Sequence, residues 1–334
     1  MKRLLKILIF PLVLFFIYFF GPRPQFDELE APNIELMDIS LDSLDRYVKG
    51  KDLNIPDLKP GNESLIVWAD SVRKTRYSVV YLHGFSASPM ESNPTHLNFA
   101  KAFGFNIYLP LLAGHGRKSI ESFADLQPND LIRDAKEAIA IGQLIGEDVI
   151  VMSCSTGSTL AIYLAGENKE LIDALIMYSP NIALKDPTAQ LVTGPWGSQI
   201  IQWVVGPYWN PNAPDEDGDA QKYWTRTYRT EGLIALQSLL DQTMTPEVFK
   251  AITQPYFVGY YYKNETEQDG TISTEAIRSF VSQTATPELQ RMVVTFPDAG
   301  EHVIANPLKG RSVQQVQDST ARFAEQILKL NPMM

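Results

Sequence analysis

The sequence predicts an α/β protein with a mostly parallel sheet, helices on both faces of the sheet and a helical insertion. Short apolar, β-branched runs recur between residues 64 and 297, helical stretches separate them, and the alternation breaks once, over residues 181–253. Strands that alternate with helices join into a parallel sheet whose faces the helices cover. With 334 residues, 45% of them hydrophobic, the chain can bury one large core of this kind.

The first element is a basic and then apolar segment at residues 1–21. Lys2, Arg3 and Lys6 precede an apolar run over residues 7–20, which is typical of an export signal with its basic end in the cytoplasm. No small-x-small cleavage site follows, and the 14 apolar residues would span about 21 Å as a helix, against a hydrocarbon core of about 30 Å. Snorkelling of Lys6 would lengthen the span. We expect an uncleaved membrane anchor; a cleaved signal peptide and a buried core helix are the alternatives.

Either form of export would put the rest of the chain outside the cytoplasm, on the periplasmic or extracellular side. The formal charge of −10 argues against nucleic acid as a partner, because nucleic-acid binding needs a basic face. The single cysteine, Cys154, excludes an intramolecular disulfide.

Residues 22–60 are predicted to be a spacer, because several prolines stand there among many acidic residues, with room for one short helix or strand. The main domain is expected over residues 61–330. Its predicted strands are SLIVWA, YSVVYLHG, FNIYLP, DVIVMS, ALIMYSP, PYFVGYYY and RMVVTFP, and its predicted helices lie around residues 96–103, 128–145, 156–165 and 313–328.

The interval 181–253 lacks a convincing strand, so we interpret it as a helical cap inserted into the domain. It holds four of the five tryptophans of the chain, namely Trp196, Trp203, Trp209 and Trp224. These side chains suit the lining of an apolar site. The alternative is that they form the small core of the insertion itself, as aromatic clusters commonly do.

The stretch VIVMSCSTGSTLAIYLAG at residues 149–166 predicts a strand that turns sharply into a helix. Ser155 stands at the turn, with Ser153 two residues before it and Gly157 two residues after it. This is the pattern G-x-S-x-G with serine in place of the first glycine; small flanking residues are needed because the backbone passes close to itself. With Ser153 as the nucleophile the flanking positions fit less well, and Cys154 would point toward the sheet. We therefore expect Ser155 to be a nucleophile.

Two other stretches supply partners for such a nucleophile. YLHGFSAS ends an earlier strand in a tight turn, where the N–H of Phe85 can face a developing oxyanion, and a second N–H would come from Thr156 at the start of a helix. His302 lies in a loop after the last predicted strand, and an acidic loop follows PYFVGYYY. The chain order is therefore serine, acid, histidine, which is one known order of a catalytic triad.

From about residue 65 to residue 330 the chain resembles the α/β-hydrolase superfamily, most closely the branch of monoacylglycerol lipases and related carboxylesterases that carry a helical cap. The motifs LHGF, LPLLAGHG, SCSTG, MYSP, QDGTIS and AGEHVI occur in that family's order. The resemblance implies an α/β-hydrolase fold with Ser155 as nucleophile, Asp269 as acid, His302 as base, and Phe85 and Thr156 as oxyanion donors.

The chain departs from the family pattern at two places. Ser153 replaces the usual glycine, and the loop before Asp269 is lengthened by YYKNETEQ. The longer loop leaves Glu267, and less readily Glu265, as a competing acid.

These features predict an exported, membrane-anchored serine hydrolase that cleaves carboxylic esters, with apolar acyl chains favoured by the aromatic cap. No metal or organic cofactor is expected. A peptidase or amidase on the same fold is the enzymatic alternative, and a catalytically silent binding protein is the alternative from another class. The oligomeric state stays open.

The other histidines and one acidic run are expected to have no catalytic role. His83 and His115 are predicted to brace loops, and His96 to lie at the surface at the start of a helix. The run DEDGDA at residues 215–220 does not have glycine and glutamate at the positions that a calcium loop requires, so we expect a solvated loop.

Overall fold

The computed structural model of the chain describes residues 15–210 and 218–333, and a seven-stranded sheet forms its centre. Its strands are β1 (Leu65–Val67), β2 (Thr75–Leu82), β3 (Asn106–Leu109), β4 (Gly146–Cys154), β5 (Ala174–Tyr178), β8 (Tyr256–Tyr260) and β9 (Arg291–Thr295). They lie in the order β1-β3-β2-β4-β5-β8-β9, and every pair is parallel except β1 with β3. All seven strands coincide with runs that the sequence predicts.

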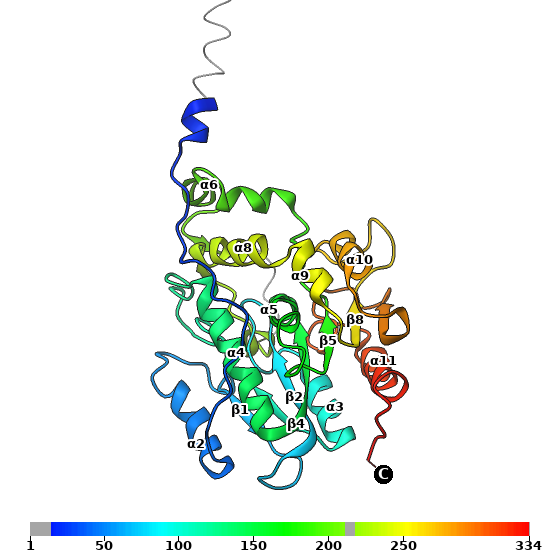
Figure 1. The fold of residues 1–334 in the computed structure, drawn as a ribbon. Coiled ribbons are helices and arrows are strands. Elements are labelled where there is room, and N and C mark those ends of the chain that lie inside the picture. The colour runs from blue at the N-terminus through cyan, green and yellow to red at the C-terminus, as the bar shows by residue number, and fades with distance from the viewer. Residues whose placement is uncertain (1–14, 211–217, 334) are drawn as a thin grey trace, which may run out of the picture.

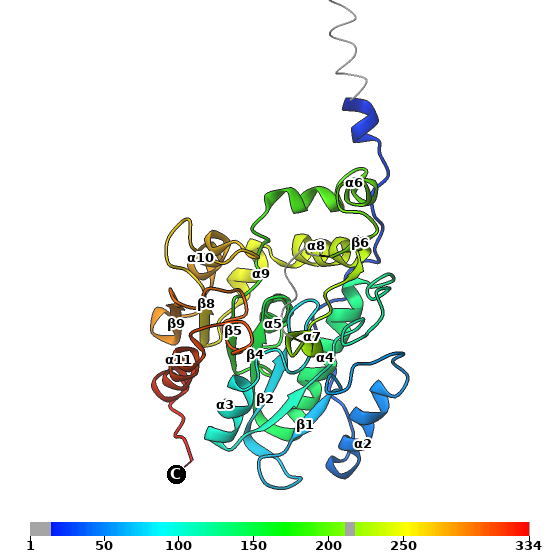
Figure 2. The same ribbon diagram turned by 180° about the vertical axis from the view of Figure 1, so that it is seen from behind.

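Helices cover both faces of this sheet (Figures 1 and 2). Alternate residues of β2 show the two layers, because Val79 belongs to one apolar cluster and Val80 to the other. The cluster of Val79 includes α3 (Thr95–Phe103) and α11 (Val313–Gln326), and that of Val80 includes α4 (Pro128–Ile145), α5 (Thr156–Ala165) and α10 (Thr274–Gln283). The predicted α/β class is confirmed.

The two helices that flank the centre of the sheet begin where the sequence predicts. Helix α4 has proline at its first position, where no intrahelical N–H bond is needed, and the Asp130 carboxylate accepts the N–H of Gln127 at 3.0 Å. Strand β4 ends at Cys154 and α5 begins at Thr156, so a single residue makes the turn between them. This short connection fixes the position of Ser155 above the carboxyl edge of the sheet.

Residues 22–40 run as an extended strap along α4 and α5 (Figure 1). The N–H of Glu30 donates to Asn129 Oδ1 at 2.9 Å, and the N–H of Ile34 donates to Asn168 Oδ1 at 3.0 Å. Apolar side chains of the strap also pack on the core, namely those of Phe26, Leu29, Ile34, Met37 and Ile39. The part of the chain that we expected to be a spacer is therefore attached to the domain along its length.

The strap leads into α2 (Leu41–Asp52), a helix that packs beside β1. Its Leu44 and Val48 side chains are fully or almost fully buried in the same cluster as α4 and α5. One short helix or strand was predicted in this region, and the structure has a helix of 12 residues.

Residues 181–210 and 218–253 lie over the carboxyl edge of the sheet as a cap (Figures 1 and 2). Its helices are η1 (Pro187–Thr193), α6 (Gly197–Val204), α7 (Ala220–Tyr223), α8 (Glu231–Thr243) and α9 (Pro246–Ala251). The expectation of an insertion without strands is wrong in one respect, because β6 (Tyr208–Trp209) pairs with β7 (Tyr228–Arg229) as an antiparallel ribbon. Strands of two residues are too short to produce a recognisable alternation in a sequence.

The first 14 residues, which carry the basic end of the expected anchor, lie outside the described residues. Residues 15–19 form a helical turn next to the cap (Figure 1). None of the helices within residues 15–210 and 218–333 is both long enough and apolar enough to cross a bilayer.

Candidate active site

Ser155 occupies a strained turn at the centre of the sheet's carboxyl edge. Its backbone has φ 51° and ψ −118°, a conformation that a residue with a side chain rarely adopts and that costs roughly 1–3 kcal/mol. The N–H of Ser155 donates to the carbonyl oxygen of Tyr178 at 3.0 Å, which ties the turn to β5. Two residues on, a Cβ at Gly157 would overlap the carbonyl oxygen of Leu82, so only glycine lets α5 lie this close to β2.

The side chains of the two residues before Ser155 take part in hydrogen bonding and packing inside the domain. The hydroxyl of Ser153, which replaces the usual glycine, lies 2.9 Å from Ser158 Oγ and donates to the carbonyl oxygen of Ile176 at 3.3 Å. The Cys154 side chain is fully buried in the apolar cluster on the face of the sheet that α3 and α11 cover. Burial raises the pKa of its thiol. A buried thiol of raised pKa forms little thiolate, so Cys154 is not suited to nucleophilic attack.

His302 and Asp269 meet at the same edge of the sheet. His302 Nδ1 lies 2.7 Å from Asp269 Oδ2, and the other carboxylate oxygen, Oδ1, accepts the N–H groups of Thr271 at 2.8 Å and Ile272 at 3.1 Å. Since an ionised carboxylate only accepts, Nδ1 carries the proton and Nε2 is left as the basic nitrogen. His302 Nε2 is buried and has no hydrogen-bond partner among the described residues.

The charges of this pair stabilise each other against the effect of burial. Burial alone would raise the pKa of Asp269, but the charge of His302 and three hydrogen bonds bring that pKa below its usual value. Burial works to lower the pKa of His302, yet the charge and hydrogen bond of Asp269, with smaller contributions from Glu91 and Glu301, raise it above its ordinary value.

The competing acids of the long loop have partners other than His302. Glu267 is half exposed, and its carboxylate accepts from Lys263 Nζ at 2.8 Å and Asn264 Nδ2 at 3.0 Å. Glu265 accepts the hydroxyl of Tyr262 at 2.7 Å. Of the acids that the sequence left open, the structure therefore brings Asp269 alone to the histidine.

Phe85 and Thr156 both line the cavity into which Ser155 faces. Among the described residues no acceptor takes the backbone N–H of either one. Thr156 is the first residue of α5, where the N–H groups of a helix have no intrahelical acceptor. Two unpaired N–H groups beside a serine can together hold a developing oxyanion.

Glu91 is a buried carboxylate at this site that the sequence analysis missed. Its Oε2 accepts the N–H of Gly84 at 2.7 Å and the hydroxyl of Tyr81 at 3.0 Å, and its side chain reaches the cavity beside Ser155. Burial raises the pKa of Glu91, while these hydrogen bonds oppose the rise. Glu91 therefore fixes the turn that carries Phe85. A lone acid in a loop gives no periodicity or motif by which a sequence could reveal this contact.

The three other histidines are all buried. His83 Nδ1 donates to the carbonyl oxygen of Gly84 at 2.9 Å and its Nε2 accepts the N–H of Leu112 at 3.1 Å, so it braces the loops as expected. His115 Nδ1 donates to the carbonyl oxygen of Ala113 at 2.8 Å. The expectation of a surface position for His96 is wrong. The His96 ring packs against the ring of Tyr81 on the face of the sheet that α3 and α11 cover, and burial lowers the pKa of His96 to about 4.

A cavity of about 760 Å³ between the sheet edge and the cap contains Ser155 and His302. Its walls are mostly apolar and come from the cap, including Leu191, Ile200, Ile201, Val204, Leu233 and Leu236. Trp209, Trp224 and Tyr228 also line it, whereas Trp203 points outward. The aromatic residues of the cap are thus divided between the cavity and the outer surface, except Trp196, whose indole N–H donates to the carbonyl oxygen of Ile17.

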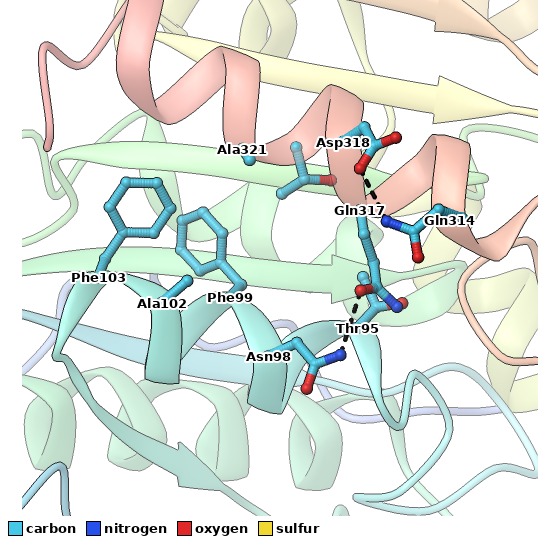
Figure 3. Close-up of a pocket in the computed structure, with 10 residues that line it drawn as sticks. Thr95, Asn98, Phe99, Ala102, Phe103, Gln314, Gln317, Asp318 and Ala321 are labelled. Atoms are coloured by element: carbon cyan, nitrogen blue, oxygen red, sulfur yellow. Dashed lines mark hydrogen bonds between the residues drawn. The ribbon is translucent and has the colours of Figure 1, made fainter. Parts of the chain in front are cut away.

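A second, smaller cavity of about 180 Å³ lies between α3 and α11, on the face of the sheet that these two helices cover (Figure 3). Its polar groups pair with each other, since Asn98 Nδ2 donates to Gln317 Oε1 at 3.1 Å and Gln314 Nε2 to Asp318 Oδ1 at 2.8 Å. No cluster of three or more potential metal ligands occurs within residues 15–210 and 218–333, and half of the acidic run DEDGDA lies outside them.

Comparison with protein families gives a match of residues 79–309 to the model described as the alpha/beta hydrolase family. Similar solved structures include that reported for LipS and LipT, two metagenome-derived lipolytic enzymes, with a TM-score of 0.64 and 14% identity over 80% of this chain and 98% of that one. A monoacylglycerol lipase of Paleococcus ferrophilus has a TM-score of 0.57 and 12% identity over 78% and 96% of the two chains. A thermophilic esterase of Thermogutta terrifontis has a TM-score of 0.53 and 16% identity over 79% and 94%.

At these identities the likeness concerns the fold alone. Comparison with curated proteins gives no match.

Proposed function

Because the chain belongs to the alpha/beta hydrolase family, we propose that it is a serine hydrolase that cleaves carboxylic esters of apolar acyl chains. The observation that carries this proposal is the cavity of about 760 Å³, in which Ser155 and His302 lie under apolar cap walls. The likeness in fold to lipolytic enzymes and esterases agrees with it.

In the proposed reaction, His302 Nε2 takes the proton of the Ser155 hydroxyl as the oxygen attacks the ester carbonyl. The backbone N–H groups of Phe85 and Thr156 hold the oxyanion of the tetrahedral intermediate. The imidazolium then protonates the leaving alcohol, which departs as the carbon–oxygen bond breaks and leaves the acyl group on Ser155. Water, deprotonated by the same nitrogen, releases the acid and restores the serine.

Asp269 would act through His302 in this scheme. Its Oδ2, 2.7 Å from Nδ1, keeps the proton on that nitrogen and stabilises the imidazolium that forms in each half-reaction. The two backbone hydrogen bonds to Oδ1 prevent the carboxylate from turning away.

The proposal is tested by labelling with a fluorophosphonate probe and by hydrolysis of p-nitrophenyl esters from acetate to palmitate. Ser155→Ala should abolish labelling and lower turnover by several orders of magnitude. The variants Ser153→Ala and Cys154→Ala should still be labelled by the probe. Turnover of p-nitroanilides in preference to the esters would favour the amidase alternative. If the protein is not labelled and hydrolyses none of these substrates, the alternative of a catalytically silent binding protein is favoured.

The second part of the proposal is that the enzyme acts outside the cytoplasm, held at a membrane by residues 1–21. The basic residues Lys2, Arg3 and Lys6, the apolar run after them and the missing cleavage site support it. The protein should fractionate with membranes with its N-terminus intact, and protease added outside the cytoplasmic membrane should digest it. A soluble form that begins near residue 22 would contradict the anchor.

A further inference from the structure

The mouth of the cavity is surrounded by apolar side chains that are themselves exposed. Leu191, Val204, Val205 and Trp209 line the cavity and also reach the outer surface, with Val204 68% exposed. Trp203, next to Val204 on the outer side of α6, is 88% exposed. An exposed tryptophan beside an apolar opening marks a surface that other apolar material covers.

A second apolar surface adjoins this mouth. All six residues from 15 to 20 are apolar or aromatic and exposed, up to 76% at Phe20, and they form the helical turn above α6 (Figures 1 and 2). The chain on their N-terminal side continues the apolar run and then carries three basic residues. The exposed turn is thus the end of the segment that the sequence predicts to be a membrane anchor.

Trp196 joins the two surfaces. Its backbone N–H donates to the carbonyl oxygen of Pro22 at 2.6 Å, and its indole Nε1–H donates to that of Ile17 at 3.0 Å. The indole ring lies where a Cβ on Gly21 would stand, so only glycine lets the chain pass this closely. Trp196 itself has φ 62°, in the left-handed region that a residue with a side chain rarely adopts. These contacts hold the start of α6 and residues 15–22 in one arrangement.

We propose that residues 15–20, Trp203 and the apolar rim of the cavity form one docking face for the surface of a lipid bilayer, with Trp196 as the clamp that aligns them. The cavity would then open toward the membrane, so that an apolar ester enters from the lipid phase. This inference rests on the proposed function for its substrate, but the docking itself does not depend on catalysis.

A bilayer is the occupant that this face fits best, because the face is continuous with the predicted anchor. A soluble partner protein would have to cover the rim while the adjoining residues 15–20 remain beside the membrane. Exposed tryptophan and tyrosine, here Trp203 and Tyr18, are typical of contact with the interface between water and lipid.

Docking is measured on the full chain reconstituted in phosphatidylcholine vesicles. An environment-sensitive fluorophore is attached to Trp203→Cys and, as the matched control, to Leu289→Cys, which replaces an apolar residue that is 92% exposed near β9. The natural Cys154 is fully buried and should not react. Brominated lipid should quench the label at position 203 at least about threefold more than the label at position 289.

Equal quenching at the two positions would overturn the proposal, because the label on the cap would then lie no closer to the lipid than the label at position 289. A label at position 203 that is shielded from aqueous iodide but not quenched by brominated lipid would also overturn it, because a second copy of the chain would then cover the face. Both results are independent of turnover, so a failed ester assay would count against the proposed function and not against docking.

The functional consequence is tested with Trp203→Asp and the control Leu289→Asp. Trp203→Asp should lower hydrolysis of a long-chain ester embedded in vesicles by about tenfold and leave p-nitrophenyl butyrate in solution unaffected, since Trp203 does not line the cavity. Leu289→Asp should change neither rate. Equal losses of rate on the two substrates would mean that Trp203 stabilises the structure of the cap and does not contact the membrane.

Discussion

Asp269 and Glu267 stand two residues apart in one loop, yet their carboxylates have opposite surroundings. Asp269 is buried against His302, and Glu267 is half exposed against Lys263. Asp269→Asn keeps an acceptor for the two backbone N–H groups but presents an amide N–H to His302 Nδ1, which favours the wrong tautomer. Turnover should fall by about 10⁴ with little change in folding.

The matched substitution is Glu267→Gln, which should change turnover by less than about tenfold because it removes only an exposed ion pair. Turnover rates of the two variants on a single p-nitrophenyl ester show which carboxylate orients His302. A severe loss in Glu267→Gln with a mild one in Asp269→Asn would move the acid to Glu267, and small losses in both would mean that another group orients His302.

Glu91 gives a prediction about pH dependence. His302 must be neutral to act as a base, so activity rises with pH through its pKa, which Asp269, Glu91 and Glu301 all raise. Glu91→Gln removes one of these negative charges, lowers the pKa of His302 and should move the acid limb of kcat/KM to lower pH. Turnover at the plateau should also fall, because the N–H of Gly84 loses a charged acceptor and the Phe85 turn is held less firmly.

A pH–rate profile of Glu91→Gln beside that of Glu301→Gln separates the two effects. Both variants should shift the acid limb, and Glu91→Gln alone should lower the plateau. An unshifted limb in Glu91→Gln would mean that Glu91 is protonated over the working range and acts only as a hydrogen-bond acceptor.

At the scale of elements, the contact between α5 and β2 depends on a single glycine. Gly157→Ala places a methyl group on the carbonyl oxygen of Leu82, so α5 must move away from the sheet. We expect a loss of about 1–3 kcal/mol in the free energy of unfolding, together with reduced turnover, because Thr156 moves with the helix. Denaturant unfolding measures the loss.

The matched control is Gly50→Ala in α2, where the added carbon would meet no atom within 4 Å apart from its chain neighbours and the backbone of its own helix. Alanine is the better helix former, so this variant should gain up to about 1 kcal/mol. A neutral result for Gly157→Ala would show that the helix and strand can separate at no cost.

The sequence predicted the seven strands and helices α4 and α5 because these elements repeat apolar residues over several turns or pleats and end at proline, glycine or the serine turn. It missed the ribbon of β6 and β7, whose two-residue strands have no period. It also misplaced His96, because a polar residue that begins a helix looks solvated unless its neighbour across space, Tyr81, is known. The role of Glu91 was not predicted for the same reason, because its hydrogen-bond partners are brought to it only by tertiary contacts.

At the scale of the whole molecule, the groups of the site come from separate parts of the chain and meet because parallel strands end at one edge. Phe85 follows β2, Ser155 follows β4, and Asp269 and His302 follow β8 and β9. The serine, an acidic loop and the histidine were predictable from the strand pattern and chain order, whereas Asp269 itself was predicted only from the family resemblance. The cavity above them was not, because it depends on how the cap helices pack.

The size and walls of that cavity predict chain-length selectivity. Each methylene buried against apolar walls gives about 0.8 kcal/mol, or roughly a fourfold gain in kcat/KM, until the cavity of about 760 Å³ is filled. We expect kcat/KM to rise from the acetate ester to at least the octanoate ester. Rates that are flat or fall beyond acetate would contradict an acyl site under the cap and point to a small or polar substrate.

The strap over residues 22–40 has a practical consequence for recombinant expression. The family match begins at residue 79, which makes a start near residue 61 look like a natural cloning boundary. Such a clone would lack Phe26, Leu29 and Ile34 as well as Leu44 and Val48 of α2, and would leave bare apolar grooves along α4 and α5. We expect inclusion bodies from it. A clone that begins at Pro22 keeps the strap and α2, loses residues 1–21 together with the hydrogen bond from the Trp196 indole to Ile17, and is the better starting point for crystallisation.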